Sequence, residues 1–424
     1  MDVKVSAAKQ LRGSIRTAGD KSVSHRYAML AGVAEGTSEF ENFSSSADCA
    51  STLACMEALG ARVRRNGNHV EVEGVGGELQ APQRELDCGN SGSTMRMLGG
   101  VVAAQPFTSV MSGDVSLSKR PMRRIIEPLE RMGARIESRQ GCAPLVIHGS
   151  RLRAIEYQPP VASAQVKSCV LLAGLFAEGE TTVIEPVRTR DHTELAIKAF
   201  GGEITRQGER VSVAGGQKLH ALKAYVPGDL SSVTFFLCAA ALFPGSSLVV
   251  DSVLLNPTRS VVLDVLSGMG VKIGFLKVEE QFGELVGTLQ AEGGAFIGGE
   301  IRGAQSAALI DELPAIAAVA PYSQKGIEIR DAAELRVKES DRIAAVVHNL
   351  RAMGAEVEEF ADGMRIPGSQ KLHGARIESF DDHRIAMAFA VAALRAEGES
   401  TIAGAEAVAV SFPEFFEALR SVVE

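Results

Sequence analysis

The stretch MGARI (132–136) decides the fold, because close copies of it recur along the chain. The copies read LGARV (59–63), FGGEI (200–204), MGVKI (269–273) and MGAEV (353–357). Each follows an amphipathic stretch and precedes alternating apolar and polar residues, a pattern typical of a helix, a glycine cap and a strand. Spacing of roughly 70 residues indicates duplication of one supersecondary unit. A sixth helix is predicted in FPEFFEALRSVVE (412–424).

A second recurring pattern alternates with the first. Six stretches open with Asp, Asn or Ser, the residues favoured at helix N-caps, and continue as helices that are apolar on nearly every face. The opening residues are Asp20, Asn90, Ser163, Asp229, Asp311 and Asp382. Helices of this kind are buried all round, so each unit is predicted to contribute one interior helix, one outer helix and several strands.

Six units divide naturally into two domains of three. Pro227 and Gly228, in YVPGDLSS (225–232), mark one crossing between domains, and TAGDK (17–21) marks the other. We therefore predict one domain over 20–227 and a second over 1–19 with 228–424. In this arrangement an N-terminal strand closes the C-terminal units.

Composition excludes several classes of protein. Hydrophobic content of 46% and charged content of 23% are typical of a globular chain, and a net charge of −8 argues against nucleic-acid binding. The six cysteines form no CxxC pair and the histidines no HExxH, so reduced thiols and no metal site are expected. No apolar N-terminal segment or membrane-length run occurs, which predicts a cytoplasmic protein without membrane association.

Cations gather near the starts of the predicted interior helices, against the preference of the helix dipole. At or near these starts lie Lys21, Arg26, Arg96, Lys167 and Arg384, and in connecting segments Arg120, Arg190, Lys338 and Arg342. Such a conflict is expected at a functional site, and helix N-termini attract anions. No P-loop and no GxGxxG after a clear strand is present. The pattern therefore favours two anionic small molecules, bound without a nucleotide in a cleft between the domains.

Carboxylates are scarce among these cations. Asp311 opens the fifth interior helix, and Glu339 lies between Lys338 and Arg342. A carboxylate held among cations stays ionised and can accept a proton from a hydroxyl group. We predict this role for Asp311, whereas Asp382 is predicted to cap its helix and position Arg384.

At these residues the chain resembles the enolpyruvyl transferases. The motifs that carry the resemblance, in order, are GDKSVSHR, GNSGSTMR, SLSKRPM, ASAQVKS, TRDHTE, LRVKESDR, DDHRIAM and SFPEF. The family implies a two-domain inverse α/β barrel of six βαβαββ units, with buried interior helices and a cleft between the domains. It also implies transfer of the enolpyruvyl group of phosphoenolpyruvate to the 5-hydroxyl of shikimate 3-phosphate. That reaction, the sixth step of the shikimate pathway to the aromatic amino acids, releases phosphate and needs no metal or cofactor.

The resemblance also implies roles for individual residues. Those expected to bind shikimate 3-phosphate are Lys21, Ser22, Arg26, Ser163, Ala164, Gln165, Arg190, Asp311 and Lys338. Those expected to bind phosphoenolpyruvate are Lys21, Asn90, Gly92, Arg120, Gln165, Arg342 and Arg384. Asp311 is the expected base, and either Glu339 or Lys21 delivers a proton to C3 of phosphoenolpyruvate; the sequence leaves that choice open.

Three positions depart from family patterns. Some members have a serine where this chain has Ala164. Many members have a lysine where this chain has Val410, and the glyphosate-tolerant branch usually has alanine where this chain has Gly92. Gly92 leaves room for glyphosate, so we expect glyphosate to compete with phosphoenolpyruvate.

Two alternative functions fit parts of the pattern. The sister branch acts on UDP-N-acetylglucosamine and usually has a reactive cysteine in the loop before an Arg-Pro pair, but here that loop, SGDVSLSKRPM (112–122), has none. A non-catalytic scaffold that binds anions would need neither Asp311 nor Glu339. The favoured partners are therefore the two small-molecule substrates, bound by a monomer.

Overall fold

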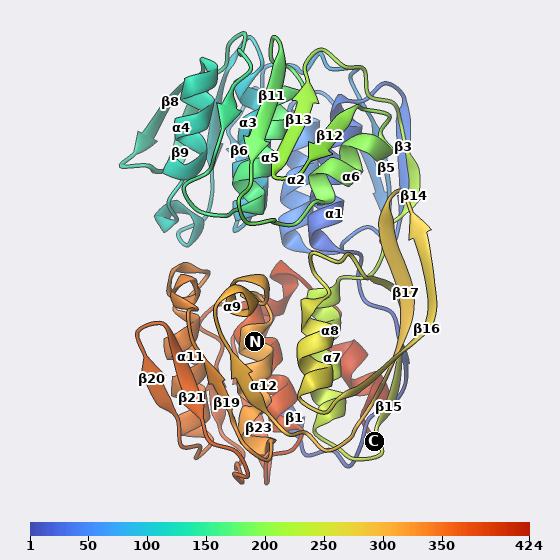
Figure 1. The fold of residues 1–424 in the computed structure, drawn as a ribbon, viewed down its shortest axis with the longest axis vertical. Helices are drawn as coiled ribbons and strands as arrows, with labels where there is room; N and C mark the ends of the chain where they lie inside the picture. Colours follow the sequence, from blue (N-terminus) through green and yellow to red (C-terminus); the bar gives the residue numbers. More distant parts are fainter. The chain divides into compact units, whose positions relative to one another are not determined.

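The computed structural model describes residues 1–424, and the chain folds into two compact units (Figure 1). Unit 1 contains Met1–Ala18, Pro227–Gln281 and Leu285–Glu424, and unit 2 contains Gly19–Val226 with Phe282–Glu284. The repeats predict one domain over 20–227 and another over 1–19 with 228–424. In the structure, both crossings between the units lie one residue earlier than these boundaries. The segment Phe282–Glu284, predicted in the other domain, groups with unit 2.

Unit 2 is built from the first three repeats. Its helices are α1 (Lys21–Val33), α2 (Ala47–Ala58), α3 (Gly92–Ala103), α4 (Arg123–Met132), α5 (Ala164–Gly174) and α6 (His192–Ala199), with the short 3-10 helix η1 (Leu117–Lys119). Its strands are β3 (Thr37–Glu41), β4 (Arg62–Asn66), β5 (His69–Glu73), β6 (Leu86–Asp87), β7 (Thr108–Ser112), β8 (Arg135–Arg139), β9 (Cys142–His148), β10 (Glu156–Tyr157), β11 (Glu180–Ile184), β12 (Ile204–Gln207), β13 (Arg210–Ala214) and β14 (Lys223–Tyr225). They form three four-stranded sheets, ordered β14-β3-β5-β4, β6-β7-β9-β8 and β10-β11-β13-β12.

Unit 1 is built from the last three repeats and the N-terminal segment. Its helices are α7 (Leu230–Ala241), α8 (Val261–Gly268), α9 (Ala304–Ala308), α10 (Leu313–Val319), α11 (Arg342–Ala352), α12 (His383–Ala393) and α13 (Phe415–Val422), with the 3-10 helices η2 (Ala320–Tyr322), η3 (Ala333–Val337) and η4 (Ala405–Val410). Its strands are β1 (Asp2–Ser6), β2 (Arg12–Ile15), β15 (Ser247–Leu254), β16 (Lys272–Gln281), β17 (Glu284–Glu292), β18 (Gly299–Ile301), β19 (Ile327–Ile329), β20 (Glu358–Phe360), β21 (Gly363–Ile366), β22 (Arg376–Glu378) and β23 (Glu399–Ala403). The sheets are ordered β16-β17-β15-β2, β18-β19-β21-β20 and β1-β23-β22.

Strands distant in sequence complete a sheet in each unit. In unit 1, β1 runs antiparallel to β23, from Asp2 opposite Ala403 to Ser6 opposite Glu399, and β2 runs parallel to β15. In unit 2, β14 from the end of the third repeat runs parallel to β3 of the first. The prediction that the N-terminal segment pairs with the C-terminal units is therefore confirmed.

The interior helices are α1, α3 and α5 in unit 2 and α7, α10 and α12 in unit 1. All 12 residues of α7 and all 11 residues of α12 are buried, as their uniformly apolar sequences predict. Phe236 of α7 packs against Phe412 and Phe415, with ring centroids 6.3 and 5.8 Å apart. Burial of one large apolar side chain contributes about 1.5–3 kcal/mol, so these helices form the core. None of the helices combines the length and the apolar character needed to cross a membrane.

The glycines of the repeated phrase adopt the conformation that the pattern predicts. Their φ angles are 104° at Gly60, 113° at Gly133, 81° at Gly201, 99° at Gly270 and 87° at Gly354. Each glycine follows an outer helix and precedes a strand. A residue with positive φ after a helix is the usual glycine cap, so the prediction is confirmed at all five positions.

The predicted helix caps are confirmed at four of six interior helices. The side chains of Asp20, Ser163, Asp229 and Asp382 accept a hydrogen bond from the first turn of the following helix. At α3 the prediction is wrong, because Ser91 caps the helix while the Asn90 side chain donates to Asp114. It is also wrong at α10, because Glu312 precedes that helix and Asp311 lies in the turn before it.

Candidate active site

Hydrogen bonds link the N-terminal halves of α1, α3 and α5 in unit 2. Gln165 of α5 donates from Nε2 to Ser93 Oγ of α3 at 2.9 Å, and Arg26 of α1 donates from Nη2 to Ser168 Oγ of α5 at 2.8 Å. Each helix start has unpaired N–H groups and a partial positive charge of about half an elementary charge. Three adjacent starts therefore favour binding of anions in this part of unit 2.

Lys21 opens α1 and forms an ion pair with Asp48, which is not among the predicted site residues. Its Nζ lies 2.8 Å from Oδ2 of Asp48, in the first turn of α2, and the two side chains are 18% and 8% exposed. The ion pair holds the ammonium group near the helix starts. Asp48 lies in FSSSADCA (43–50). An acid that follows a run of serines at a helix start is the sequence feature that could have pointed to this residue.

His25 is a neutral member of the cation-rich motif. Burial lowers the pKa of His25 well below its ordinary value, and the nearby charges of Lys21 and Arg26 lower it further. Its Nδ1 lies 2.7 Å from Thr52 Oγ1, which in turn lies 2.7 Å from Thr94 Oγ1 of α3. His25 therefore ties α1, α2 and α3 together without adding positive charge.

Arg26 is almost fully buried, with 3% exposure. It donates from Nε to Thr193 Oγ1 at 2.6 Å, from Nη1 to the Ser22 carbonyl oxygen at 2.8 Å and from Nη2 to Ser168 Oγ. Burial lowers the pKa of Arg26 to about 10, against the opposing charges of Glu194 and Asp20, so the guanidinium remains positive at neutral pH. Thr193 and Ser168, neither of which was predicted, thus fix this cation in place.

Gln165 is oriented by a second arginine. Arg96 Nη1 donates to Gln165 Oε1 at 2.7 Å, and this sets the amide so that Nε2 faces Ser93. A β-carbon added at Gly92 would lie 2.9 Å from Arg96 Nη1 and 3.5 Å from Arg120 Nη1. The absence of a side chain at Gly92 therefore leaves room for both guanidinium groups.

Arg120 follows η1 and contacts the loop before α3. Its Nη2 donates to Asn90 Oδ1 at 2.8 Å and to Ser116 Oγ at 3.2 Å, and its Nη1 donates to the Asn90 carbonyl at 3.3 Å. Asn90 Nδ2 donates to Asp114 Oδ2 at 2.7 Å. The predicted residues Asn90, Gly92 and Arg120 therefore lie together.

In unit 1 the predicted acids and cations also lie together. Asp311 Oδ1 lies 3.7 Å from Arg342 Nη1 and 3.9 Å from Lys338 Nζ, and the Asp311 side chain is 20% exposed. Arg384 Nη1 donates to the Asp311 carbonyl oxygen at 2.6 Å. Burial lowers the pKa of Lys338, although Asp311 opposes that shift. The Asp311 carboxylate thus lies beside two cations.

Arg342 is the most enclosed cation of unit 1, with 1% exposure. It donates from Nε to Asp382 Oδ2 at 2.8 Å and from Nη2 to Glu339 Oε2 at 2.7 Å. Burial alone would lower the pKa of Arg342, but Asp382 and Glu339 raise it above its ordinary value. Asp382 also caps α12 through the Arg384 backbone N–H, as predicted. The Asp382 carboxylate therefore accepts hydrogen bonds from the Arg342 side chain and from the Arg384 backbone N–H.

Lys167 differs from the other cations near the helix starts. It was predicted among the converging positive charges, but its side chain is fully buried against Glu185 and Glu194, with Nζ–O distances of 2.9 Å to each. A lysine at the fourth position of α5 points into the wall of unit 2 rather than beyond the helix start. Gln165, two residues earlier in α5, instead donates to Ser93 in the first turn of α3.

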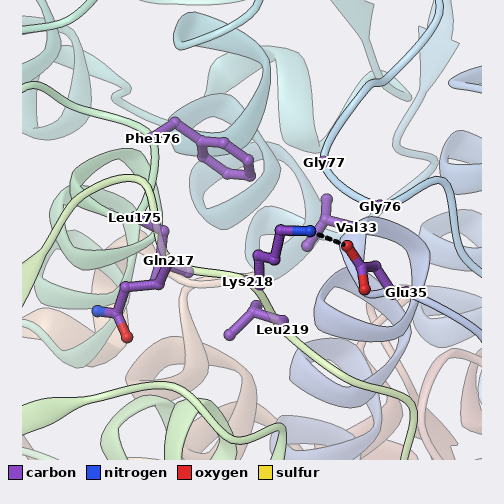
Figure 2. A pocket seen from close by; sticks show the side chains of 9 residues that line it. All are labelled: Val33, Glu35, Gly76, Gly77, Leu175, Phe176, Gln217, Lys218 and Leu219. Carbon is purple, nitrogen blue, oxygen red and sulfur yellow. Dashed lines mark hydrogen bonds and ion pairs between the residues drawn. The ribbon is translucent and has the colours of Figure 1, made fainter.

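A small hollow of about 40 Å³ in unit 2 is a weaker candidate for a binding site (Figure 2). Its lining includes Val33, Leu175 and Phe176, at the C-terminal ends of α1 and α5, and the Lys218–Glu35 ion pair at 2.9 Å. Helix C-termini carry partial negative charge, and a 13-residue helix such as α1 is about 20 Å long. The hollow is therefore far from the cations at the helix starts.

The comparisons with known proteins identify the family of this chain. The family model described as EPSP synthase (3-phosphoshikimate 1-carboxyvinyltransferase) matches residues 5–419. The chain is 63% identical over 423 residues to a 3-phosphoshikimate 1-carboxyvinyltransferase of Koribacter versatilis (strain Ellin345), which covers 100% of this chain and 99% of the relative. It is 54% identical over 426 residues to the enzyme of that name from Solibacter usitatus (strain Ellin6076), with 100% of both chains covered.

Solved structures show the same fold. A 2.37 Å structure of EPSP synthase from Acinetobacter baumannii superimposes with a TM-score of 0.89 at 41% identity, and the match covers 100% of this chain and 98% of that one. The resemblance carried by the eight motifs is confirmed, as is the predicted two-domain inverse α/β fold. This chain belongs to the EPSP synthase (3-phosphoshikimate 1-carboxyvinyltransferase) family.

Proposed function

We propose that this protein is an enzyme that transfers the enolpyruvyl group of phosphoenolpyruvate to the 5-hydroxyl of shikimate 3-phosphate and releases phosphate. The reaction is a step of the shikimate pathway towards the aromatic amino acids. The observation that carries the proposal is the full-length relationship to 3-phosphoshikimate 1-carboxyvinyltransferases, at up to 63% identity among the relatives described above. The clusters of cations in both units suit two substrates that each carry a phosphate and a carboxylate.

The proposed chemistry begins with attack of the 5-hydroxyl oxygen on C2 of phosphoenolpyruvate. Asp311 accepts the hydroxyl proton, and C3 gains a proton from Glu339 or Lys21. The tetrahedral intermediate then loses a proton from C3 and expels phosphate by cleavage of the C2–O bond, which restores the double bond. A base must be ionised to act, and the cations 3.7 and 3.9 Å from Asp311 favour its ionised form.

The two candidates for the C3 proton donor lie in different surroundings. Glu339 Oε2 accepts a hydrogen bond from Arg342 at 2.7 Å, and Lys21 Nζ lies 2.8 Å from Asp48. The arginine next to Glu339 favours the carboxylate form, which opposes proton donation. Lys21 carries a proton in its ordinary state, so we favour Lys21 as the donor.

The remaining predicted residues are proposed to bind the substrates. Ser22, Arg26, Ser163, the Ala164 backbone, Gln165, Arg190 and Lys338 bind shikimate 3-phosphate, and Asn90, Gly92, Gln165, Arg120, Arg342 and Arg384 bind phosphoenolpyruvate. Arginine suits this task because its planar fork matches pairs of carboxylate or phosphate oxygens.

The proposal is tested by identifying the product. The protein is mixed with phosphoenolpyruvate and either shikimate 3-phosphate or UDP-N-acetylglucosamine, and the vinyl protons of the product are followed by NMR. We expect a new pair of vinyl signals, on an enol ether of the shikimate ring, with the first acceptor alone. Signals with UDP-N-acetylglucosamine alone would assign the chain to the sister reaction, and no product from folded protein would support a non-catalytic anion-binding scaffold.

We also propose that the enzyme acts in the cytoplasm as a monomer that needs no metal or other cofactor. Light scattering after size-exclusion chromatography is expected to give a mass near 44.8 kDa. Turnover is expected to persist after dialysis against a chelator. A dimer mass would overturn the first expectation, and loss of activity that a metal restores would overturn the second.

A further inference from the structure

Lys167 is a fully buried lysine whose ammonium group meets two carboxylates. It lies in the first turn of α5, and its Nζ donates to Glu185 Oε2 and to Glu194 Oε1, both at 2.9 Å. Its Nζ also lies 3.5 Å from the Thr189 carbonyl oxygen. Glu185 directly follows β11, whereas Glu194 lies in the first turn of α6, so one lysine bridges the two ends of the intervening loop.

A second cation shares the same two carboxylates. Arg206 of β12 donates from Nη2 to Glu185 Oε2 at 2.6 Å and to Glu194 Oε1 at 2.9 Å. Two positive and two negative groups therefore form a neutral cluster. Burial alone would raise the pKa of Glu185, but Lys167, Thr189 and Arg206 hold it below its ordinary value. The Glu185 carboxylate is thus held in the charged state that the bridge requires.

The cluster also contacts the loop that carries Arg190, through Thr189. Thr189 donates to Glu185 Oε1 from its backbone N–H at 3.3 Å and also from its hydroxyl group. Thr193, next to Glu194, lies 2.6 Å from Ser168 Oγ of α5 and accepts from Arg26 Nε at 2.6 Å. The loop is therefore tied to α5 on both sides of Arg190. The Arg190 charge is close enough to Arg26 to lower the pKa of Arg26.

A packing role alone does not account for these four charges. Taking charged groups out of water is costly, and well-packed apolar side chains of similar volume are often at least as stable. Departures of this kind from the simplest packing are expected next to functional sites. Here the buried charged cluster contacts the loop that carries Arg190, which is proposed to bind shikimate 3-phosphate.

We propose that Lys167 is a positioning residue for shikimate 3-phosphate binding: by bridging Glu185 and Glu194, it fixes the 185–194 loop and so the place of Arg190. Lys167 itself contacts no substrate. This inference rests on the proposed function, in which Arg190 binds shikimate 3-phosphate.

The first test is the steady-state kinetics of Lys167→Met. We expect the KM for shikimate 3-phosphate to rise about tenfold, with kcat and the KM for phosphoenolpyruvate within twofold of wild type. Lys167→Arg, which keeps the charge, is expected to recover most of the loss. Lys198→Met, which removes an exposed lysine of α6, is the matched control and is expected to leave all three parameters unchanged.

The second test is a double-mutant cycle with Arg190→Ala. If Lys167 acts through Arg190, adding Lys167→Met to Arg190→Ala raises the KM for shikimate 3-phosphate by less than about twofold further. Independent, multiplying effects would overturn the inference. So would folded Lys167→Met with a wild-type KM for shikimate 3-phosphate, because a purely structural residue changes only the melting temperature and the folded fraction.

A third variant keeps the inference testable if Lys167→Met does not fold. Arg206→Met removes the other cation from the same carboxylates, and its side chain is 24% exposed, so it is expected to fold. It is expected to raise the KM for shikimate 3-phosphate selectively, and an unchanged value would overturn the inference. Wild-type protein separates this failure from failure of the proposed function: no phosphate release from wild type rejects the function, whereas normal release with unaffected variants rejects only the role of Lys167.

Discussion

At the scale of single residues, the central assignment is Asp311 as the base. Its carboxylate lies beside Lys338 and Arg342, and Arg384 holds its backbone carbonyl. The next residue, Glu312, accepts a hydrogen bond from Ser231, whose hydroxyl also accepts from Arg259 at 2.6 Å. The turn that carries Asp311 is therefore held in place by contacts on both sides. A general base needs such fixed positioning, because it must lie within hydrogen-bond distance of the hydroxyl proton.

Asp311→Asn is expected to lower kcat by about 10²–10⁴-fold, the usual contribution of a general base, because the amide cannot accept the proton. Substrate binding is expected to persist, since the side-chain shape is retained. Stopped-flow and steady-state phosphate release measure kcat, and calorimetry measures binding. Asp264→Asn, at an exposed acid of α8, is the control and is expected to behave as wild type. Near-normal turnover of Asp311→Asn would exclude it as the base.

Gly92→Ala tests the space around the two guanidinium groups. The added β-carbon would lie 2.9 Å from Arg96 Nη1, so Arg96 must move and its hydrogen bond to Gln165 is disturbed. We expect the KM for phosphoenolpyruvate to rise roughly fivefold, equivalent to about 1 kcal/mol. Glyphosate is expected to compete with phosphoenolpyruvate in the wild type and to inhibit the variant less. Inhibition that is equal in both proteins would contradict this account of Gly92.

His25 predicts a pH dependence of stability. Because burial depresses its folded-state pKa, the unfolded chain, with a histidine pKa near 6.5, binds a proton that the folded chain does not. The contribution of neutral His25 to the free energy of unfolding is therefore complete above about pH 6.5. It is lost as the pH falls, by up to about 1.4 kcal/mol per pH unit. His25→Asn is expected to flatten this part of the urea-unfolding profile, and His220→Asn, at an exposed position, is expected to leave it unchanged. Parallel profiles for wild type and His25→Asn would contradict a buried neutral His25.

At the scale of helices and strands, the glycine caps could be predicted from sequence because their conformation is local. A helix that ends before a strand needs a residue with positive φ, and glycine meets this requirement with little strain. The cap at α3 was mispredicted for a tertiary reason. Asn90 is as good a capping residue as Ser91, but its amide is engaged by Asp114 and Arg120, which lie 24 and 30 residues away in the chain.

The glycine caps of unit 1 offer a matched pair of substitutions. An alanine β-carbon at Gly270 would lie 2.0 Å from the Ala295 carbonyl oxygen, whereas at Gly354 it would meet only the His373 ring, at 2.9 Å. Gly354→Ala is expected to destabilise the protein by about 1–2 kcal/mol, the usual cost of a left-handed residue with a side chain. Gly270→Ala is expected to cost more, because a backbone carbonyl cannot turn aside as a ring can. Equal urea-unfolding midpoints would contradict this comparison.

The direction of Lys167 could not be predicted from sequence for a similar reason. Lys21, Arg96 and Lys167 all lie near helix starts, and the sequence does not say which face of each helix they occupy in the folded unit. Lys167 meets Glu185 and Glu194 only because β11 and α6 pack beside α5. Long-range partners of this kind decide which cations are available to a ligand.

At the scale of the whole molecule, the repeats predict the six units and the N-terminal contribution to the last ones. β1 pairs with β23 and so covers a sheet edge that would otherwise be exposed. The sign of this in the sequence is that the sixth unit is incomplete. The sequence does not reveal that Phe282–Glu284 groups with unit 2, where Glu284 Oε1 lies 2.6 Å from His192 Nδ1. That contact again depends on residues far apart in the chain.

Deletion of residues 1–6 tests the role of the N-terminal strand. It removes a ladder of five residue pairs and exposes the β23 edge, so we expect the free energy of unfolding to fall by about 3 kcal/mol or more. Chemical denaturation monitored by circular dichroism measures the change. Lys4→Ala removes only an exposed ion pair with Glu399 and is expected to leave the unfolding midpoint unchanged. An unaltered midpoint after the deletion would show that β1 is not part of the stable sheet.

The measurement that tests the central claim most directly is the rate of phosphate release from phosphoenolpyruvate by wild-type protein, with and without shikimate 3-phosphate. The proposed function predicts rapid release only when shikimate 3-phosphate is present, and none with UDP-N-acetylglucosamine in its place. Release that depends on UDP-N-acetylglucosamine, or no release from folded protein with either acceptor, would contradict it.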